Sequence, residues 1–424
     1  MRPALTTTFW SLRIRNFRLF AGGQVISLSG TWAQRIAQDW LVLELSGGSG
    51  VALGLVTGLQ FLPILLFSLY GGLLADRYDK RRMLVLLQAV MGLLALALGL
   101  LDVSGAVALW HVYALAFLLG LANAVEIPVR QTFVIELVGP DELPNAVSLN
   151  SATFNSARIV GPAVGGLLIT AVGTGWVFLL NAASYAAVLI GLCAIRASEL
   201  QPSVPVERTR GQVRAGLSYV RQRPDLLAPI VLVGVVGTFG LNFQLTLALV
   251  SREVFGRGAG AFALLTSMLA VGSLLGALAS ARRAGPPRVR RLLGSALAFG
   301  ALLVLVGLAP SYALMAVLLV PTGFAVLLFS TTAKAIVQLG SDPHMRGRVV
   351  ALYVLVFLGG TPVGAPLAGF VAEHLGPRAS MVAGGLVVLL GAGLTTWYLA
   401  HHRELRLDAH LLRRRPHVHV RPTA

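Results

Sequence analysis

The sequence predicts an all-α membrane protein with about twelve transmembrane helices, arranged as two six-helix bundles that repeat one another. Of its 424 residues, 56% are hydrophobic and only 12% are Asp, Glu, Lys or Arg, about half the charged share of a soluble protein. Apolar runs of ~20 residues or more, each long enough to cross the hydrocarbon core of a bilayer, follow one another along the chain. Short segments of the first half also recur in the second half.

The predicted spans form two groups of six on either side of a polar segment at 196–225. The first group covers 17–45, 51–75, 83–101, 109–130, 143–171 and 174–195. The second group covers 226–252, 259–281, 290–309, 312–333, 347–372 and 379–400. We therefore expect an amino-terminal bundle at 1–195, a linker at 196–225, a carboxy-terminal bundle at 226–400, and a basic, disordered tail at 401–424.

The net charge of +17 is distributed unevenly between the two sides that these spans define. The side with both termini and the 196–225 linker carries 24 Lys or Arg in its connecting segments, whereas the other side carries only Arg257 and Arg378. The positive-inside rule then places both termini and the linker in the cytoplasm. The basic character thus indicates topology and contact with anionic lipid headgroups rather than a nucleic-acid partner.

The repeat between the two halves has an offset of 203 residues. NAVSL at 145–149 aligns with RVVAL at 348–352, and GPAVGG at 161–166 aligns with GAPLAG at 364–369. Six spans repeated in the same orientation predict two similar bundles with a cavity between them. This arrangement is typical of transporters that expose one site alternately to the two sides of the membrane.

Residues 71–82, GGLLADRYDKRR, place two glycines, two aspartates and four cations in one turn between apolar runs. Gly71 and Gly72 allow the end of one helix to approach a neighbouring helix closely. Asp76 can face the positive amino-terminal end of another helix, and the cations favour the cytoplasmic membrane surface. A turn that only set the topology would need the cations, but neither the glycines nor Asp76.

This 71–82 loop resembles the signature loop between the second and third helices of the major facilitator superfamily. The family pattern is Gly-x-Leu-Ala-Asp-Arg-x-Gly-Arg-Lys, and here Asp79 and Lys80 take the places of the last glycine and the first cation. The resemblance implies a gating latch that keeps the cytoplasmic side closed when the cavity faces outward. Its residues would be Gly72, Asp76, Arg77, Lys80 and Arg81.

A second motif, RIVGPAVGG at 158–166, resembles the Gly-Pro motif of superfamily exporters of the proton-antiport type. The residues expected to let the helix pack closely and bend are Gly161, Pro162, Gly165 and Gly166. Small residues permit close packing, and Pro162 removes one backbone hydrogen bond. The alternative is ordinary helix packing, because glycine and proline are common in such spans.

Segments 15–34 and 126–162 resemble one branch in particular, the bacterial siderophore and macrolide exporters of the enterobactin-exporter type. This resemblance implies a monomeric, proton-coupled exporter of a small amphipathic compound in the bacterial inner membrane, with an alternating-access mechanism. The fourth span departs from the classical drug–proton antiporters, because it lacks their mid-helix arginine motif. Three alternatives stay open: a nutrient importer or facilitator, a lipid flippase, and a transport-inactive sensor or scaffold.

Two acids lie well inside the predicted spans, where an ionisable group costs about 2.5–3.5 kcal/mol to insert. Asp39 follows Arg35 by four residues and Glu126 precedes Arg130 by four, so each acid can form an ion pair within its own helix. Arg158 lies about halfway along the fifth span. The hypothesis is that Asp39 or Glu126 binds and releases a proton and that Arg158 responds. The alternative is two purely structural ion pairs.

Polar residues on the first span recur at helical spacing and should face a watery cavity rather than lipid. The substrate-cavity candidates are Gln24, Thr31, Gln34, Gln38, Asn155, Asn242 and Gln244. Aromatic residues that could add apolar surface, or serve equally as helix packing, are Trp32, Trp40, Phe61, Phe154 and Phe243. Because the second half has few polar groups at mid-span, an amphipathic solute fits better than a sugar.

The sequence predicts no enzyme, cofactor or metal site. It contains neither the GxxxxGK[ST] phosphate-binding loop nor a recognisable Ser/His/Asp or Cys/His constellation. The single cysteine, Cys193, excludes an internal disulfide and a CxxC site. The HVHV tract at 417–420 resembles a metal-binding tract, but a tail at the membrane surface is the expectation. Transport would therefore draw its energy from an ion or solute gradient.

Overall fold

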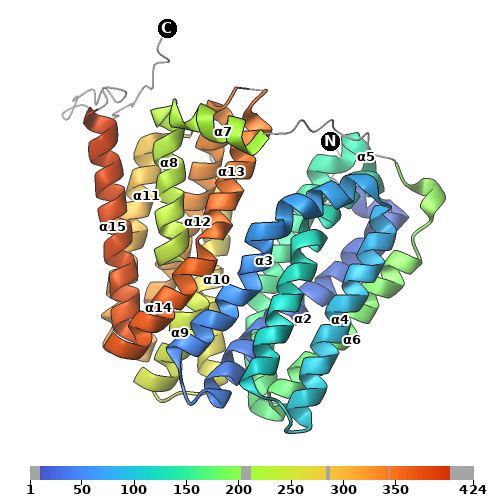
Figure 1. Cartoon of the computed structure of the whole chain (residues 1–424), viewed down its shortest axis with the longest axis horizontal. Coiled ribbons are helices and arrows are strands. Elements are labelled where there is room, and N and C mark those ends of the chain that lie inside the picture. Colours follow the sequence, from blue (N-terminus) through green and yellow to red (C-terminus); the bar gives the residue numbers. More distant parts are fainter. Residues whose placement is uncertain (1–9, 202–211, 283–286, 343, 402–424) are drawn as a thin grey trace. The chain divides into compact units, whose positions relative to one another are not determined.

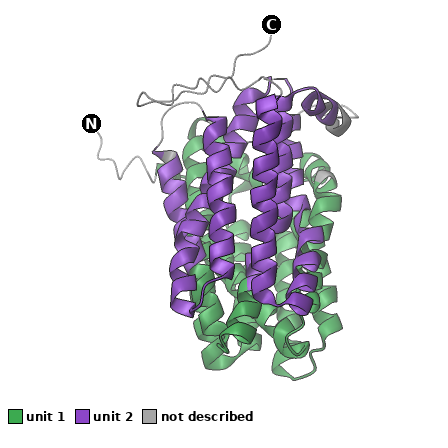
Figure 2. Ribbon diagram, turned by 90° about the vertical axis from the view of Figure 1, so that its left-hand side faces the viewer, with its two compact units in different colours: residues 1–207, 247–267 green, residues 208–246, 268–424 purple. Residues whose placement is uncertain are grey.

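The computed structural model describes residues 10–201, 212–282, 287–342 and 344–401, and these are almost entirely helical (Figure 1). No strand occurs among them. The predicted disorder of the tail concerns residues 402–424, which lie outside the described part. The described residues belong to two compact units, which are coloured separately in Figure 2. Unit 1 comprises 1–207 and 247–267, and unit 2 comprises 208–246 and 268–424.

Unit 1 is built from the long helices of the first half of the chain. Its helices are α2 (Arg15–Leu45), α3 (Gly50–Arg77), α4 (Lys80–Val103), α5 (Leu109–Val172) and α6 (Thr174–Cys193), with short 3-10 turns η1 (Trp10–Arg13) and η2 (Ala197–Glu199). Helix α5 packs against α2, α3 and α4, and α6 packs against α2 and α4. The contacts of α2 with both α5 and α6 bury its polar side chains inside the unit.

Most of unit 2 is built from the second half of the chain. Its elements begin with α7 (Gln212–Arg221), α8 (Pro224–Val235), the π-helix η3 (Val236–Gly240) and α9 (Phe243–Leu249), which is followed by the π-helix η4 (Val250–Val254). They continue with α10 (Ala259–Ala281), α11 (Val289–Gly307), α12 (Tyr312–Gly340), α13 (Arg346–Gly359), α14 (Thr361–Leu375) and α15 (Pro377–His401). The segment 247–267, from within α9 to within α10, groups with unit 1, although the predicted carboxy-terminal bundle included it.

Eleven helical stretches of the described residues are long and apolar enough to cross a membrane. They match eleven of the twelve predicted spans. The remaining span, 17–45, forms the 31-residue helix α2, which is long enough but more polar. Its polar stripe is buried rather than lipid-facing: Gln24, Gln34, Gln38 and Asp39 are each at most 6% exposed. A helix whose polar side chains face the protein interior can therefore span a membrane even though its mean hydropathy is lower than that of the other spans.

The outward faces of the helices are apolar, as a lipid environment requires. On α4, Leu86, Leu93 and Leu100 recur every seven residues and are 65%, 63% and 55% exposed. This spacing places them on one helical face. Such a continuous apolar stripe would be an aggregation hazard in water but is the expected surface in a bilayer.

The predicted repeat is visible in the backbone of both units. Gly173 ends α5 with φ at 87°, and Gly376 ends α14 with φ at 92°, both in the left-handed region that favours glycine. Gly161 packs against the backbone of α2, and Gly364 packs against that of η3. Each pair is 203 residues apart, so the two halves share helix ends and helix contacts as well as sequence segments.

Helix α5 contains both the fourth and the fifth predicted spans. The backbone departs from helical geometry at Gly139, where φ is 73°, so the two spans meet there at a kink. The side chain of Gln201 packs on Gly139, and the backbone amide of Gln201 donates a hydrogen bond to the carbonyl oxygen of Glu136 (2.9 Å). The start of the predicted linker is thus attached to the connection between spans four and five.

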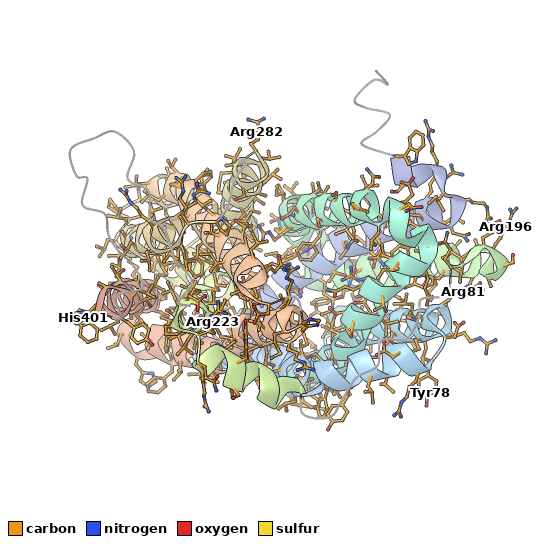
Figure 3. The ribbon with its side chains drawn as sticks, turned by 90° about the horizontal axis from the view of Figure 1, so that it is seen from above. Tyr78, Arg81, Arg196, Arg223, Arg282 and His401 are labelled. Atoms are coloured by element: carbon orange, nitrogen blue, oxygen red, sulfur yellow. The ribbon has the colours of Figure 1, made fainter. Side chains whose placement is uncertain are left out.

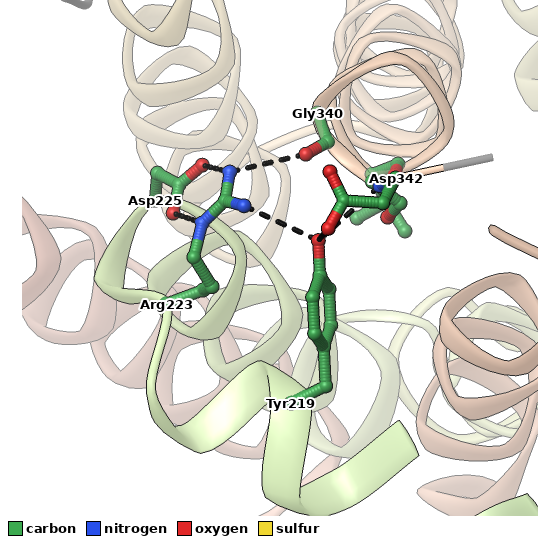
Figure 4. Close-up of polar contacts among 7 residues, drawn as sticks. Tyr219, Arg223, Asp225, Gly340 and Asp342 are labelled. Atoms are coloured by element: carbon green, nitrogen blue, oxygen red, sulfur yellow. Dashed lines mark hydrogen bonds and ion pairs between the residues drawn. The ribbon is translucent and has the colours of Figure 1, made fainter. Parts of the chain in front are cut away.

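The other end of the linker is attached to unit 2 through a polar cluster (Figure 4). Arg223 donates to both carboxylate oxygens of Asp225 (2.9 and 2.7 Å) and to the carbonyl oxygen of Gly340 (3.1 Å). The hydroxyl of Tyr219, on α7, donates to Asp342 (2.9 Å) and accepts from Arg223 (3.2 Å). Since Asp342 is 203 residues after Gly139, both ends of the linker contact equivalent connections of the two repeats.

Candidate functional site

A polar cavity of about 110 Å³ lies inside unit 1, among α2, α4, α5 and α6. Helix α2 contributes the predicted stripe, because Gln24, Thr31 and Arg35 all line this cavity. Gln34 and Gln38 line a smaller cavity that shares Thr31 and Arg35 with the larger one. The residues that helical spacing places on one face of α2 therefore line cavities of unit 1, and their role as substrate-cavity residues stays a prediction.

The acid in this cavity is Glu126, which is 5% exposed. One carboxylate oxygen, Oε1, lies 2.9 Å from Nε of Arg130, four residues later on α5, so the expected ion pair is present. The same oxygen accepts a hydrogen bond from Nε2 of Gln88 on α4 (3.3 Å). The charge of Glu126 is thus balanced by Arg130 and shared with a neutral neighbour.

The second expected ion pair, between Arg35 and Asp39, is not formed, so that prediction was wrong. The guanidinium of Arg35 lies over the ring of Trp32, 4.7 Å from its centre, and 5.9 Å from the centre of the Phe61 ring. Long helical side chains slope toward the amino terminus of their helix, which carries Arg35 toward Trp32 and away from Asp39. Asp39 is 6% exposed, and its Oδ2 atom has no hydrogen-bond partner among the described residues.

The remaining predicted site residues of the fifth span do not line the cavity. Asn155 donates its side-chain amide to the carbonyl oxygen of Ser151 on its own helix (2.8 Å), while its neighbour Phe154 lines the cavity instead. The Nη2 atom of Arg158 is buried without a hydrogen-bond partner in the described part of the chain. The one-residue displacement from Asn155 to Phe154 turns the side chain by about 100° around the helix.

Two predicted cavity residues, Asn242 and Gln244, belong to unit 2. Asn242 donates to the carbonyl oxygen of Thr238 one turn earlier (2.8 Å), so its amide is occupied locally. Gln244 has a buried Nε2 atom without a partner among the described residues. These side chains are polar groups inside unit 2, and their role as cavity residues stays a prediction.

The 71–82 loop is attached to unit 1 by its charged residues. Asp79 caps α4, because its Oδ1 atom accepts a hydrogen bond from the backbone amide of Arg82 (2.7 Å). Lys80 forms an ion pair with Glu136 on α5 (2.7 Å). Arg81, labelled in Figure 3, donates to the carbonyl oxygens of Leu192 and Cys193 at the end of α6 (2.8 Å each).

The glycines expected to permit close helix packing do so within unit 1. A Cβ atom added to Gly71 would lie 2.9 Å from the Cα atom of Val125 on α5. One added to Gly161 would lie 2.7 Å from the carbonyl oxygen of Ser29 on α2, and one on Gly165 would lie 2.9 Å from the Cα atom of Ala33. Gly166 contacts Ala263 in the part of α10 that belongs to this unit. The backbone stays helical through Pro162, and the kink of α5 lies at Gly139 instead.

Residues 6–418 match the model of the transmembrane secretion effector family, a branch of the major facilitator superfamily. The chain belongs to this family. Curated relatives include the multidrug efflux pump Tap of Mycolicibacterium fortuitum, which is 28% identical over 88% of this chain and 92% of its own. The enterobactin exporter EntS of Escherichia coli is 26% identical over 84% of each chain, and the staphyloferrin A transporter of Staphylococcus aureus is 24% identical over 85% and 90%.

Solved structures support the same fold at lower identity. A bacterial homologue of the human lysosomal transporter Spinster, in an inward-facing and unoccupied conformation, superposes with a TM-score of 0.72 over 91% of this chain and 97% of its own, at 17% identity. A POT family transporter in complex with a thioalcohol-conjugated peptide gives 0.72 over 92% and 97%, at 12% identity. This member of the family therefore has the all-α membrane transporter fold that its sequence predicts.

Several residues of the transporter's cavity were missed by the sequence analysis, namely Gln88, Asn123 and Tyr185. Gln88 is an isolated polar residue in an otherwise apolar span, which is a signal that the sequence does contain, and the structure buries it at 4% exposure. The same criterion finds Asn123. Tyr185 carries no such signal, because tyrosine is common in membrane helices. No group of side chains suited to hold a metal ion occurs in the described ranges.

Proposed function

We propose that this member of the transmembrane secretion effector family is a proton-coupled exporter of a small amphipathic compound in the bacterial inner membrane. The observation that carries the proposal is the buried Glu126–Arg130 ion pair beside a polar cavity in unit 1. The names of its relatives, a multidrug efflux pump and an enterobactin exporter, favour export. An ionisable pair inside a span needs a function or a structural reason, and here it faces a cavity that a solute can occupy.

Glu126 is the better candidate for the proton site. Protonation of Glu126 would remove the negative charge that Arg130 neutralises, so Arg130 would become free to bind a solute or to move. Protonation of Asp39 would break no ion pair, and Asp39 does not line the cavity. We therefore assign the coupling step to Glu126 and Arg130. In this proposal, Asp39, Arg35 and Arg158 are nearby charged groups that influence the coupling step through their charge.

The conformational cycle proposed here uses the two repeats as the moving parts. One bundle would rock against the other, as in other transporters built from parallel repeats. In this proposal Gly72, Asp76 and Arg77 form the latch, while Lys80 and Arg81 hold the loop in place on α5 and α6. The termini are proposed to be cytoplasmic, in keeping with the distribution of Lys and Arg, and the working unit is a monomer.

The test is accumulation of fluorescent compounds in inside-out membrane vesicles with an imposed acidic lumen. Wild-type protein should load the vesicles with at least one amphipathic dye or siderophore, and collapse of the proton gradient should abolish loading. Glu126→Gln should abolish gradient-driven loading, whereas Asp39→Asn should reduce it less. Glu199→Gln is the matched control, because Glu199 forms an exposed ion pair with Arg196, which is labelled in Figure 3.

Three outcomes would contradict parts of this function. Unchanged gradient-driven loading by Glu126→Gln would exclude Glu126 as the coupling site. Accumulation in right-side-out vesicles, with none in inside-out vesicles, would show an importer. Headgroup-labelled phospholipid that crosses the bilayer in place of the soluble compounds would identify a flippase.

A further inference from the structure

The cavity of unit 1 contains a cation, Arg35, that forms no ion pair with a side chain of the described residues. Arg35 lines both parts of the cavity, and its guanidinium makes no hydrogen bond or ion pair within the described residues. Its contacts are with the faces of Trp32 and Phe61. A guanidinium has five N–H donors in a planar arrangement that matches a carboxylate. No hydrogen bond from these donors to another described residue is formed, and Arg35 lines a polar cavity.

The lining as a whole carries an excess positive charge. Glu126 and Arg130 balance each other at 2.9 Å, which leaves Arg35 as the additional charge. Asp39, the acid nearest to Arg35 along α2, does not line the cavity. A cation held in a water-poor site attracts an anion far more strongly than it would at the surface. Asp39 acts on Arg35 through its charge but forms no ion pair with it, so a neutral or cationic solute would leave the guanidinium without an anion in contact.

The cavity wall beside Arg35 is aromatic. Trp32 and Phe154 form an edge-to-face pair with ring centres 5.8 Å apart, and Trp32 also carries the guanidinium on its face. Two buried amides have free capacity for hydrogen bonding, at Nε2 of Gln24 and at Oε1 of Gln88. The site therefore offers an aromatic surface, a cation, one free donor and one free acceptor.

The size of the cavity restricts what it can hold. A cavity of ~150 Å³ in another protein accommodates benzene, and this one has about 110 Å³. There is room for one aromatic ring at most, with its carboxylate directed to Arg35. A larger compound could insert only one such end group.

We propose that this cavity binds the aromatic carboxylate end of the transported compound, with the carboxylate on Arg35 and the ring against Trp32 and Phe154. That the bound compound is the transported one rests on the proposed function. Binding itself requires neither export nor proton coupling. It restricts the substrate class from small amphipathic compounds in general to aromatic anions.

The experiment measures binding of three matched probes to the full chain in phosphatidylcholine nanodiscs, where no acidic lipid competes. The probes are 4-fluorobenzoate, 4-fluorobenzamide and 4-fluorobenzylamine, which present one ring with a negative, neutral or positive group, followed by ¹⁹F NMR. Wild-type protein should bind the benzoate about tenfold more tightly than the benzamide, as expected for a charge-assisted bidentate contact. The benzylamine should bind most weakly.

The variants separate a role in anion binding from a role in folding. Arg35→Gln should reduce the benzoate preference to less than about twofold while leaving benzamide affinity within about twofold. Arg35→Lys should retain a smaller preference, because it keeps the charge but not the planar pair of donors. Arg196→Gln, at a 61% exposed side chain, is the control and should leave all three affinities unchanged.

Equal affinity of wild-type protein for benzoate and benzamide would overturn the proposal, and so would tightest binding of benzylamine. If Arg35→Gln loses binding of the benzamide as well, Arg35→Lys decides: a benzoate preference above about twofold supports the proposal and equal affinity overturns it. The test of export can fail while the test of benzoate binding succeeds. Arg35-dependent benzoate binding without gradient-driven vesicle loading would contradict the proposed function and leave this inference standing.

Discussion

The ammonium nitrogen of Lys80 lies 2.7 Å from a carboxylate oxygen of Glu136, and only 11% and 13% of the two side chains are exposed. This pair joins the first residue of α4 to α5, close to the kink at Gly139. Asp79 caps α4 beside it and Arg81 binds the end of α6. The 71–82 loop is therefore fixed to α5 by Lys80 and to α6 by Arg81, and Asp76, at the end of α3, is the acid proposed to act as the latch.

Removing one partner of this pair should destabilise unit 1. Lys80→Met leaves the carboxylate of Glu136 largely buried without its cation, and we expect a loss on the order of 3 kcal/mol. The double variant Lys80→Met/Glu136→Leu should recover most of the loss, because neither member of the pair is then left without the other. Thermal unfolding in detergent measures both. Arg196→Gln, which breaks an exposed pair, should change stability by less than about 1 kcal/mol. Equal Tm values for Lys80→Met and the wild-type protein would contradict this prediction.

Asp76→Asn should reduce gradient-driven loading of inside-out vesicles by about tenfold without lowering Tm, because about 1.4 kcal/mol of lost latch interaction corresponds to that factor. The reason is that the amide keeps the shape of the side chain but loses the charge that interacts with a helix amino terminus. Asp79→Asn is the matched comparison, since asparagine caps a helix as well as aspartate does. Loading at the wild-type rate by Asp76→Asn would show that the loop sets topology only.

Gly161→Ala should weaken the packing of α5 on α2. The added methyl group would lie 2.7 Å from the carbonyl oxygen of Ser29, which cannot move without the backbone of α2. Overpacking of this kind costs about 1–3 kcal/mol. Gly22→Ala on α2 is the control, because nothing lies within 4 Å of its added methyl group and helix propensity favours alanine by up to ~1 kcal/mol. The free energy of unfolding should therefore fall in Gly161→Ala and rise in Gly22→Ala.

Arg223→Gln should release α7 from the end of α12. It removes the donor that joins Asp225, Tyr219 and the carbonyl oxygen of Gly340. Amide hydrogen exchange in 212–221 should accelerate severalfold, while Arg221→Gln, at an exposed position of α7, should leave it unchanged. The same exchange rate in Arg223→Gln and wild-type protein would show that apolar contacts alone hold α7.

The attachment of α7 should not depend on pH between 6 and 9. The hydrogen bonds and charge of Asp225 raise the pKa of Arg223 above its ordinary value. A group whose folded-state pKa is raised stabilises the fold at every pH below its unfolded value, and this contribution is lost only as the pH rises through the folded value. For an arginine that window lies far above pH 9. Protection factors of 212–221, corrected for intrinsic exchange, should therefore stay constant; a fall between pH 6 and 9 would implicate another group.

Much of the fold could be predicted because it depends on interactions within one helix or on periodicity along the chain. The spans follow from runs of apolar residues, and the wet face of α2 follows from the spacing of Gln24, Thr31 and Arg35. The Glu126–Arg130 pair joins neighbouring turns of one helix, where the geometry is set by the helix itself. The left-handed backbone at Gly173 and Gly376 accompanies the repeat that the sequence displays.

Only the tertiary structure decided which groups from different helices meet. Lys80 and Glu136 are 56 residues apart, and Gln88 reaches Glu126 from another helix, so no spacing rule relates them. The failure of the Arg35–Asp39 pair is partly of this kind: the ring of Trp32 belongs to α2 itself, but the polar cavity that Arg35 also faces exists only once α2 is packed against α5 and α6. The sequence by itself determined the helices and their polar faces, whereas the free cation and the cavity it faces were decided by how those faces pack together.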